Sequence, residues 1–351
     1  MGGRRPVLAT VVTGLATWPC ANSRRLRISD LTFYIGERGC LCVGLSCEGP
    51  PETYAKGQHP MSTVAPLSQP SGPALADVCK RIREISTLPQ VAMRVMEVAG
   101  NPDAGAREMK EVMENDVALS ARVLRSVNSS AYAVRTRITN LQQAISYLGF
   151  KQIRNLAMTA SVSRMFQNRK KIGTYSRENL WRHLVAVGIC ARLLAMRLRL
   201  SDFEDIFLAG LLHDCGIVLM DQHAHPSFVA AINALTEGET FPQTERRVFG
   251  FDHAMLGGSV AQAWKLPNSI ADSIRHHHDA SHYRGNYPQM VQCVEVANFL
   301  CSLKELTSVG KQLVEFPQAT IAAMGLKKED LVALAQDLDR ELEKNQMLSQ
   351  L

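Results

Sequence analysis

The chain has 351 residues, of which 46% are hydrophobic, 21% are charged and 6% are aromatic. These fractions are typical of a globular protein, and they exclude a wholly disordered chain, a collagen and a small disulfide scaffold. Lys and Arg outnumber Asp and Glu by 39 to 33, which gives a net charge of +6; so weak an excess permits an anionic partner without indicating one.

Residues 1–75 are rich in Gly, Pro, Ser, Thr and Cys, and six prolines punctuate residues 49–73. Such a composition favours a linker. We predict that this segment is a disordered extension, or that it precedes the true start of the protein at Met61. The alternative is a short β-hairpin around residues 31–43, because Leu31–Ile35 has the composition of a strand.

Neither a membrane anchor nor a disulfide framework is predicted. No apolar run reaches the roughly 18 residues that a membrane helix needs. Residues 6–18 follow two arginines as in an export signal, but threonines and a glycine dilute the apolar stretch. The nine cysteines are an odd number, and the later ones lie scattered through apolar helical patterns. We therefore expect a reduced, cytoplasmic protein with no membrane partner.

From residue 76 onward the apolar periodicity is helical, so the predicted fold class is all-α, a two-part helical bundle. The predicted units are an extension and linker at 1–75, an N-terminal helical bundle at 76–172, a second helical block at 173–305 and a helical tail at 306–351. Local signals mark some helix ends. Ser201 and Glu204 fit a capping box that opens the helix 202–212, and Asn128 and Ser129 are residue types that close helix ends.

Six histidines and one aspartate of the second block lie inside predicted helices or at their ends: His183, His213, Asp214, His253, His276, His277 and His278. A metal site needs several imidazole nitrogens and at least one carboxylate converging in a cavity. The apolar run 207–212 leads into His213 and Asp214, which places this pair in the bundle interior. A carboxylate that bridges two metals there can activate water for attack on a phosphoester. The alternative is a set of hydrogen-bonded core histidines and solvated helix ends.

Short motifs follow one another through the helical region: Leu88-Pro89, Asn115–Leu119, Val127–Tyr132, Ala144–Gly149, Trp181–His183, Ala209–Asp214, Asp252-His253, Trp264–Pro267 and His277-His278. This series, which covers roughly residues 80–305, resembles the HDOD (HD-related output domain) branch of the HD superfamily of metal-dependent phosphohydrolases. The resemblance implies a first helical bundle packed against a degenerate HD-type block. It also implies a regulatory output module of bacterial signalling.

The metal ligands that the resemblance implies are His183, His213, Asp214, His253, His277, His278 and, in the last position, Asn298. An aspartate is expected in that last position, and an asparagine is neutral and binds a hard cation poorly. Ile217 stands where the catalytic HD-GYP branch often has a lysine, and the Gly-Tyr-Pro signature is absent. We therefore expect a degenerate HD site for divalent Fe, Mn or Zn; if it is active, Asp214 and His213 are the catalytic residues.

Three functions remain open at the level of sequence. The first is a non-enzymatic signal-transduction regulator that acts through contacts with other signalling proteins, and the departures at Asn298 and Ile217 favour it. The second is a metal-dependent phosphohydrolase or phosphodiesterase acting on a nucleotide or cyclic dinucleotide. The third is a nucleic-acid-binding regulator with a basic patch, whose residues are Arg164, Arg169, Lys170 and Lys171.

Overall fold

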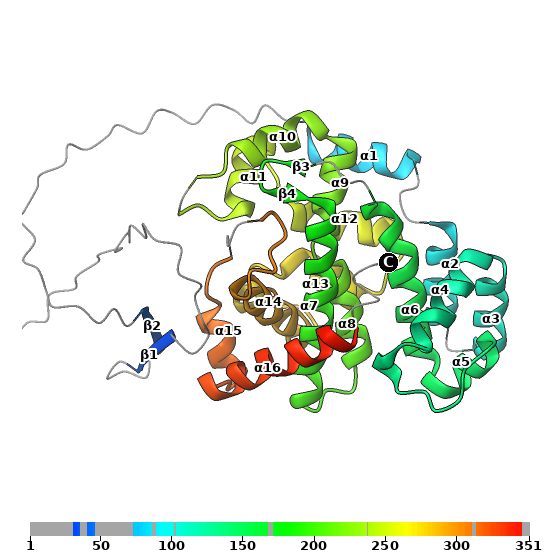
Figure 1. Cartoon of the computed structure of the whole chain (residues 1–351). Coiled ribbons are helices and arrows are strands. Elements are labelled where there is room, and N and C mark those ends of the chain that lie inside the picture. Colours follow the sequence, from blue (N-terminus) through cyan, green and yellow to red (C-terminus); the bar gives the residue numbers. More distant parts are fainter. Residues whose placement is uncertain are drawn as a thin grey trace, which may run out of the picture.

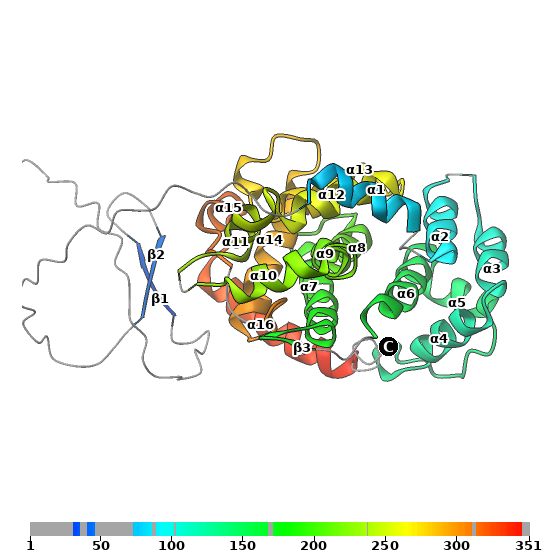
Figure 2. The same ribbon diagram turned by 90° about the horizontal axis from the view of Figure 1, so that it is seen from above.

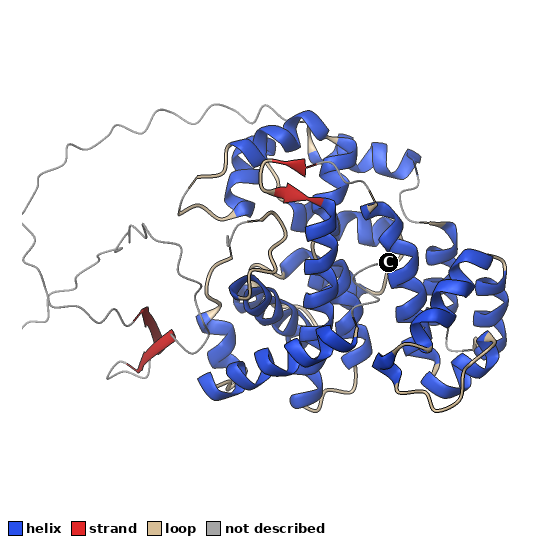
Figure 3. Cartoon of the chain, in the orientation of Figure 1, coloured by secondary structure: helices blue, strands red, loops and turns tan. Residues whose placement is uncertain are grey.

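The computed structural model describes residues 31–35, 41–45, 73–85, 89–101, 103–167, 171–236, 238–310 and 314–345. Within these ranges the chain is helical apart from two short antiparallel strand pairs (Figure 3). The predicted all-α class is therefore confirmed. No helix in the part of the chain that the structure describes has the length and apolar character that crossing a membrane requires.

The N-terminal segment contains strands β1 (Leu31–Ile35) and β2 (Leu41–Leu45), which pair antiparallel with Leu31 opposite Leu45. This pairing agrees with the alternative prediction of a short hairpin, while the assignment of residues 1–75 as a disordered extension or linker stays a prediction. The remaining residues of the predicted extension up to residue 72, including the alternative start at Met61, lie outside the described residues.

The first block is a compact group of short helices on one side of the molecule (Figures 1 and 2): α2 (Gln90–Gly100), α3 (Ala106–Glu114), α4 (Val117–Val127), the 3₁₀ turn η2 (Ser130–Tyr132), α5 (Leu141–Leu148), α6 (Phe150–Val162) and the 3₁₀ turn η3 (Ser163–Phe166). Side chains cap these helices as their sequences suggest. Asp116 accepts a hydrogen bond from the backbone N of Leu119, 2.9 Å away, at the start of α4. At its end, the Asn128 amide bridges the carbonyls of Leu124 and Ile138.

The second block surrounds the long helix α7 (Figure 1). Its elements are β3 (Lys171–Ile172), β4 (Tyr175–Ser176), α7 (Arg177–Arg197), α8 (Phe203–Leu212), α9 (Cys215–His223), α10 (His225–Asn233), α11 (Phe241–Phe249), α12 (His253–Ala263), α13 (Asn268–His276), the 3₁₀ turn η4 (Ala280–His282) and α14 (Pro288–Leu303). Helices α8 and α14 both pack against α7, and α12 packs against α13. Nearly all apolar side chains of α7 are buried, which explains its lack of a polar face.

The first helix and the last two helices of the chain's described part join the second block. Helix α1 (Leu75–Ile85), within the segment predicted as the N-terminal bundle, packs against α9 and α12 and buries Val78 and Ile82 there (Figure 2). The predicted tail forms α15 (Gln318–Ala323) and α16 (Lys328–Lys344), and α16 lies along α7 and reaches η2 of the first block. The first bundle therefore begins at α2 in space.

Charged residues at the start of α8 join the two blocks. Arg154 of α6, which is buried, pairs with Asp205 at 2.6 Å, and Lys151 reaches the same carboxylate at 2.9 Å. Glu204 accepts a hydrogen bond from Asn155 and pairs with Arg192. The predicted capping box of Ser201 and Glu204 is therefore wrong: the N-cap residue of α8 is Asp202, and Glu204 is turned inward because α6 docks against it.

Candidate metal centre

Close approach of backbones brings the predicted ligands together. Helix α8 ends at Leu212, and the turn His213–Asp214 follows it into the core. Glycine makes this possible on two sides: a Cβ atom on Gly210 would come within 2.9 Å of the Cα of Gly188 in α7, and a Cβ on Gly216 would overlap the carbonyl oxygen of His253. The His213–Asp214 turn therefore touches α7 on one side and the start of α12 on the other.

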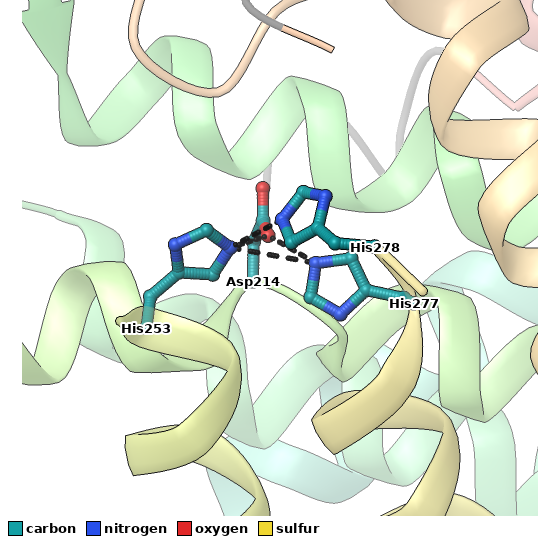
Figure 4. A group of neighbouring side chains, drawn as sticks. All are labelled: Asp214, His253, His277 and His278. Carbon is teal, nitrogen blue, oxygen red and sulfur yellow. Dashed lines mark hydrogen bonds and ion pairs between the residues drawn. The ribbon is translucent and has the colours of Figure 1, made fainter. Parts of the chain in front are cut away.

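Asp214 stands at the centre of the cluster and divides it into two groups that share its carboxylate. Its Oδ2 atom lies 3.4 Å from Nε2 of His183 and 3.3 Å from Nε2 of His213. Its Oδ1 atom lies 3.0 Å from Nε2 of His253 and 3.2 Å from Nε2 of His277 (Figure 4). His278 completes the second group, with its Nε2 atom 2.9 Å from that of His253.

Hydrogen bonds at Nδ1, the ring nitrogen away from Asp214, fix the orientation and the tautomer of the imidazoles. Three of the Nδ1 atoms donate to backbone carbonyls: His183 to Leu306 at 2.7 Å, His213 to Gly210 at 2.8 Å and His277 to Ile274 at 2.8 Å. A carbonyl only accepts, so each Nδ1 carries the proton, and in the neutral ring Nε2 is left with a lone pair. Lone pairs on His183 and His213 then face each other at 3.3 Å, an arrangement that a cation stabilises.

Burial and neighbouring charges set the protonation of the cluster. Burial lowers the pKa of His213 to about 4 and that of His278 well below the usual value. Burial also opposes the charge of Asp214, but His213 and His253 hold the pKa of this carboxyl well below its ordinary range. Neutral imidazoles around an ionised carboxylate are the forms that bind divalent metals.

His253 differs from the other imidazoles because carboxylates flank it on both sides. Its Nδ1 lies 2.6 Å from Oε2 of Glu245, and its Nε2 faces Asp214. Although burial opposes a charge on the ring, Glu245 and Asp214 raise the pKa of His253 well above its usual value. The space beside Nε2 therefore favours positive charge, which a bound cation also supplies.

The donor set fits a divalent metal. The side chains of His183, His213 and His277 are fully buried, and Asp214 is 2% exposed. Imidazole nitrogens with a shared carboxylate are ligands that suit Fe, Mn and Zn. Asn298 of α14 is buried, and its Oδ1 atom has no hydrogen-bond partner among the described residues. It is not one of the side chains in the two groups around Asp214, so its place as the last ligand stays a prediction.

A cavity of about 440 Å³ adjoins the cluster at His277 and His278. Its wall includes three carboxylates, those of Asp279, Glu295 and Glu315, and one arginine, Arg246. That arginine is already paired with Asp252, with 2.7 Å between Arg246 Nε and Asp252 Oδ2. Two of the carboxylates have partners as well: His282 Nδ1 lies 2.5 Å from Oδ1 of Asp279, and Oε1 of Glu295 accepts from the backbone N of Ala280. Carboxylates still outnumber arginine and lysine in the wall of the cavity, three to one.

Sequence reasoning missed Glu245, and no signal in the sequence could have identified it. It lies in the middle of α11, on a different helix from His253, among polar residues that look solvent-exposed.

The structure describes two of the four residues of the predicted basic patch. Arg164 pairs with Asp116 at 3.1 Å, Lys171 is exposed, and Arg169 and Lys170 lie outside the described residues.

Comparison with protein families matches residues 85–280 to the HDOD domain. A solved HDOD domain protein of unknown function from Geobacter sulfurreducens is 26% identical, covers 78% of this chain and 98% of its own, and superposes with a TM-score of 0.64. A protein from Marinobacter aquaeolei VT8, provisionally named a signal transduction protein, is 22% identical with a TM-score of 0.62, covering 78% of this chain and 63% of its own.

Two further proteins are similar to this chain. A protein from Shewanella amazonensis SB2B, provisionally named a phosphohydrolase, is 22% identical with a TM-score of 0.63 and covers 80% of this chain and 98% of its own. An uncharacterised protein of Treponema pallidum (strain Nichols) is 24% identical over 277 residues, which are 77% of this chain. The match spans only 52% of that relative, about half of its length.

Proposed function

This chain belongs to the HDOD family, and from that membership we propose that it is a signal-transduction regulator that binds divalent metal at the Asp214 cluster and acts through protein contacts, not by turnover. The observation that carries the proposal is the acidic cavity beside His277 and His278. Sites that handle phosphoryl groups place Arg or Lys around the charge. Here an anionic substrate that approached the metals would meet Asp279, Glu295 and Glu315.

The position of the cluster in the fold suits regulation. Its ligands come from α7, the turn between α8 and α9, the start of α12 and the end of α13. Bound metal would hold these elements together and supply the positive charge that the imidazoles and Asp214 lack. Helix α8 also carries Asp205, which pairs with Arg154 of the first block, and α7 packs against η3 of that block. Metal binding would therefore change the stability of the contact between the two blocks, and with it the surface that they offer together to a protein partner.

A metal-dependent phosphohydrolase acting on a nucleotide or cyclic dinucleotide is the second candidate. One observation favours it: Asp214 offers one oxygen to each of two histidine groups, as a carboxylate that bridges two metals does. We do not extend the proposal to nucleic acid, because Asp116 already neutralises Arg164.

Turnover assays on metal-loaded protein separate the two candidates. The full chain, loaded anaerobically with Fe²⁺, Mn²⁺ or Zn²⁺ and assayed for metal content, is offered a panel of nucleotides, cyclic dinucleotides and bis(p-nitrophenyl) phosphate. Bound metal without turnover supports the regulator. Hydrolysis that disappears in Asp214→Ala would overturn it in favour of the enzyme, and a wild-type chain that binds no metal would contradict the proposal as a whole.

A further inference from the structure

Glu245 is a fully buried carboxylate on α11 that belongs to none of the predicted ligand positions. Its Oε2 atom accepts two hydrogen bonds from one residue: from Nδ1 of His253 at 2.6 Å and from the backbone N of His253 at 3.1 Å. Its Oε1 atom has no hydrogen-bond partner among the described residues. Burying such a group costs free energy unless a positive charge compensates it.

Helix α11 is held so that Glu245 meets His253 in one geometry. The ring of Phe241 stacks on the ring of His253, with centroids 5.8 Å apart and planes 20° apart. Arg246 pairs with Asp252, whose other oxygen caps α12 through the backbone N of Met255 at 2.8 Å. Three successive contacts from α11 therefore fix the first turn of α12 and the orientation of the His253 ring.

The two groups around Asp214 are supported differently on their outer sides. In the first group, His183 and His213 both donate to neutral backbone carbonyls. In the second group, His277 donates to a carbonyl but His253 donates to a carboxylate. A carboxylate behind an imidazole raises the basicity of the nitrogen that binds the metal. The second group also has one more imidazole than the first.

We propose that Glu245 is the positioning residue of the second metal position, formed by Asp214, His253, His277 and His278, and makes it the tighter of the two. The inference rests on the proposed function, because it presupposes that the cluster binds metal. It concerns Glu245 through His253 and requires no contact between Glu245 and the metal. The difference in support predicts stepwise binding, with the second position filled first.

Glu245→Gln tests the charge, since glutamine keeps the size of the side chain and an oxygen that can accept from Nδ1. The full chain is titrated anaerobically with Co²⁺ in competition with a chelator, with elemental analysis of bound metal. We expect the tighter equivalent to weaken by about 10–100-fold and the weaker one to stay unchanged. The visible spectrum of the first bound Co²⁺ should change as well. Circular dichroism checks that the variant is folded.

Glu204→Gln is the matched control, because Glu204 is also a buried glutamate but pairs with Arg192 away from the cluster. It should change either metal affinity by far less than Glu245→Gln changes the tighter one. If Glu245→Gln binds both equivalents as the wild type does, Glu245 only supports the backbone and the inference is wrong, while the proposed function stands. If the wild type binds no metal, the proposed function itself fails.

Ligand variants give a second test that does not depend on the folding of Glu245→Gln. His183→Ala should keep the tight Co²⁺ equivalent and lose the weak one. His277→Ala should lose the tight equivalent. The reverse assignment, or two equivalents of equal affinity in the wild type, would overturn the inference.

Discussion

At the start of α8, Glu204 and Asp205 meet cations of the protein itself, whereas just beyond its end Asp214 is surrounded by imidazoles. Arg154 and Arg192 neutralise the first pair, and Asn155 provides further hydrogen bonds. Around Asp214, three imidazole rings donate a hydrogen bond from Nδ1 to a backbone carbonyl, so their Nε2 atoms face the carboxylate. The first cluster, of Arg154, Asn155, Arg192, Glu204 and Asp205, pairs its charges within the protein and forms the joint between the two blocks. The second cluster leaves imidazole nitrogens turned toward a carboxylate, the donor set of a divalent metal site.

The difference shows how a structural polar cluster can be told from a binding one. Both are buried and rich in charged residue types, so burial alone does not separate them. The balance of donors and acceptors does, because a cluster with surplus acceptors has lone pairs free to bind a metal ion, whereas a cluster of paired charges has none. Helix α8 connects the two clusters, so a displacement of Asp214 would be transmitted along α8 to Glu204 and Asp205.

The largest expected effect is the loss of metal in Asp214→Ala. This carboxylate belongs to both groups, so its removal should weaken both metal positions by more than the about 10–100-fold that loss of a supporting partner costs. Elemental analysis after dialysis at fixed free metal measures the loss. Asp279→Ala, which removes an exposed carboxylate at the cavity, should retain the wild-type metal content. Equal retention in both variants would contradict the central role of Asp214.

The joint between the blocks should respond chiefly in stability. Arg154→Ala leaves Asp205 without its buried partner, and breaking a buried pair in this way costs about 3 kcal/mol. Lys151→Ala removes the exposed partner of the same carboxylate and should cost about 1 kcal/mol or less. Urea unfolding measures both changes. Equal losses in the two variants would show that Arg154 is no more important than a surface cation.

Metal should in turn stabilise the second block. A ligand that binds only the folded state at about 100 times its Kd adds about 2.7 kcal/mol to the free energy of unfolding. Thermal unfolding with Mn²⁺, before and after excess EDTA, should show a reversible rise in Tm. In His213→Ala the rise should shrink because one group loses an imidazole. A Tm that is indifferent to Mn²⁺ in the wild type would argue that the cluster is only a packed core.

The smallest expected effect is a pH dependence at the joint. Burial opposes the charge of Asp205, but Arg154 and Lys151 hold the pKa of its carboxyl below the ordinary value. The ionised form therefore stabilises the fold above the unfolded pKa of about 4, and this stabilisation disappears as the pH falls through the lower folded pKa. The stability difference between wild type and Asp205→Asn should shrink on acidification. A difference that stays constant with pH would show that the charge plays no part.

Much of this protein could be predicted from its sequence because the signals are local. Apolar periodicity indicated helices from residue 76 onward, and Asn128 does close the end of α4 as its residue type suggests. The ordered histidine motifs identified His183, His213, Asp214, His253, His277 and His278 as one set, and the structure brings these side chains together. The helices and the cap need only residue type and spacing, whereas the set of six side chains was implied by the resemblance to the HDOD family.

Other features were decided by tertiary structure alone. Ser201 and Glu204 satisfy a capping box locally, but docking of α6 turns Glu204 toward Asn155 and Arg192 instead. Helix α1 precedes the first bundle in sequence and packs on the second block in space. Glu245 looks like any polar residue of an exposed helix until α11 places it behind His253. The physical reason is the same in all three cases: sequence determines which groups a helix carries, but the partner that buries each group comes from a distant segment, and only the packing selects it.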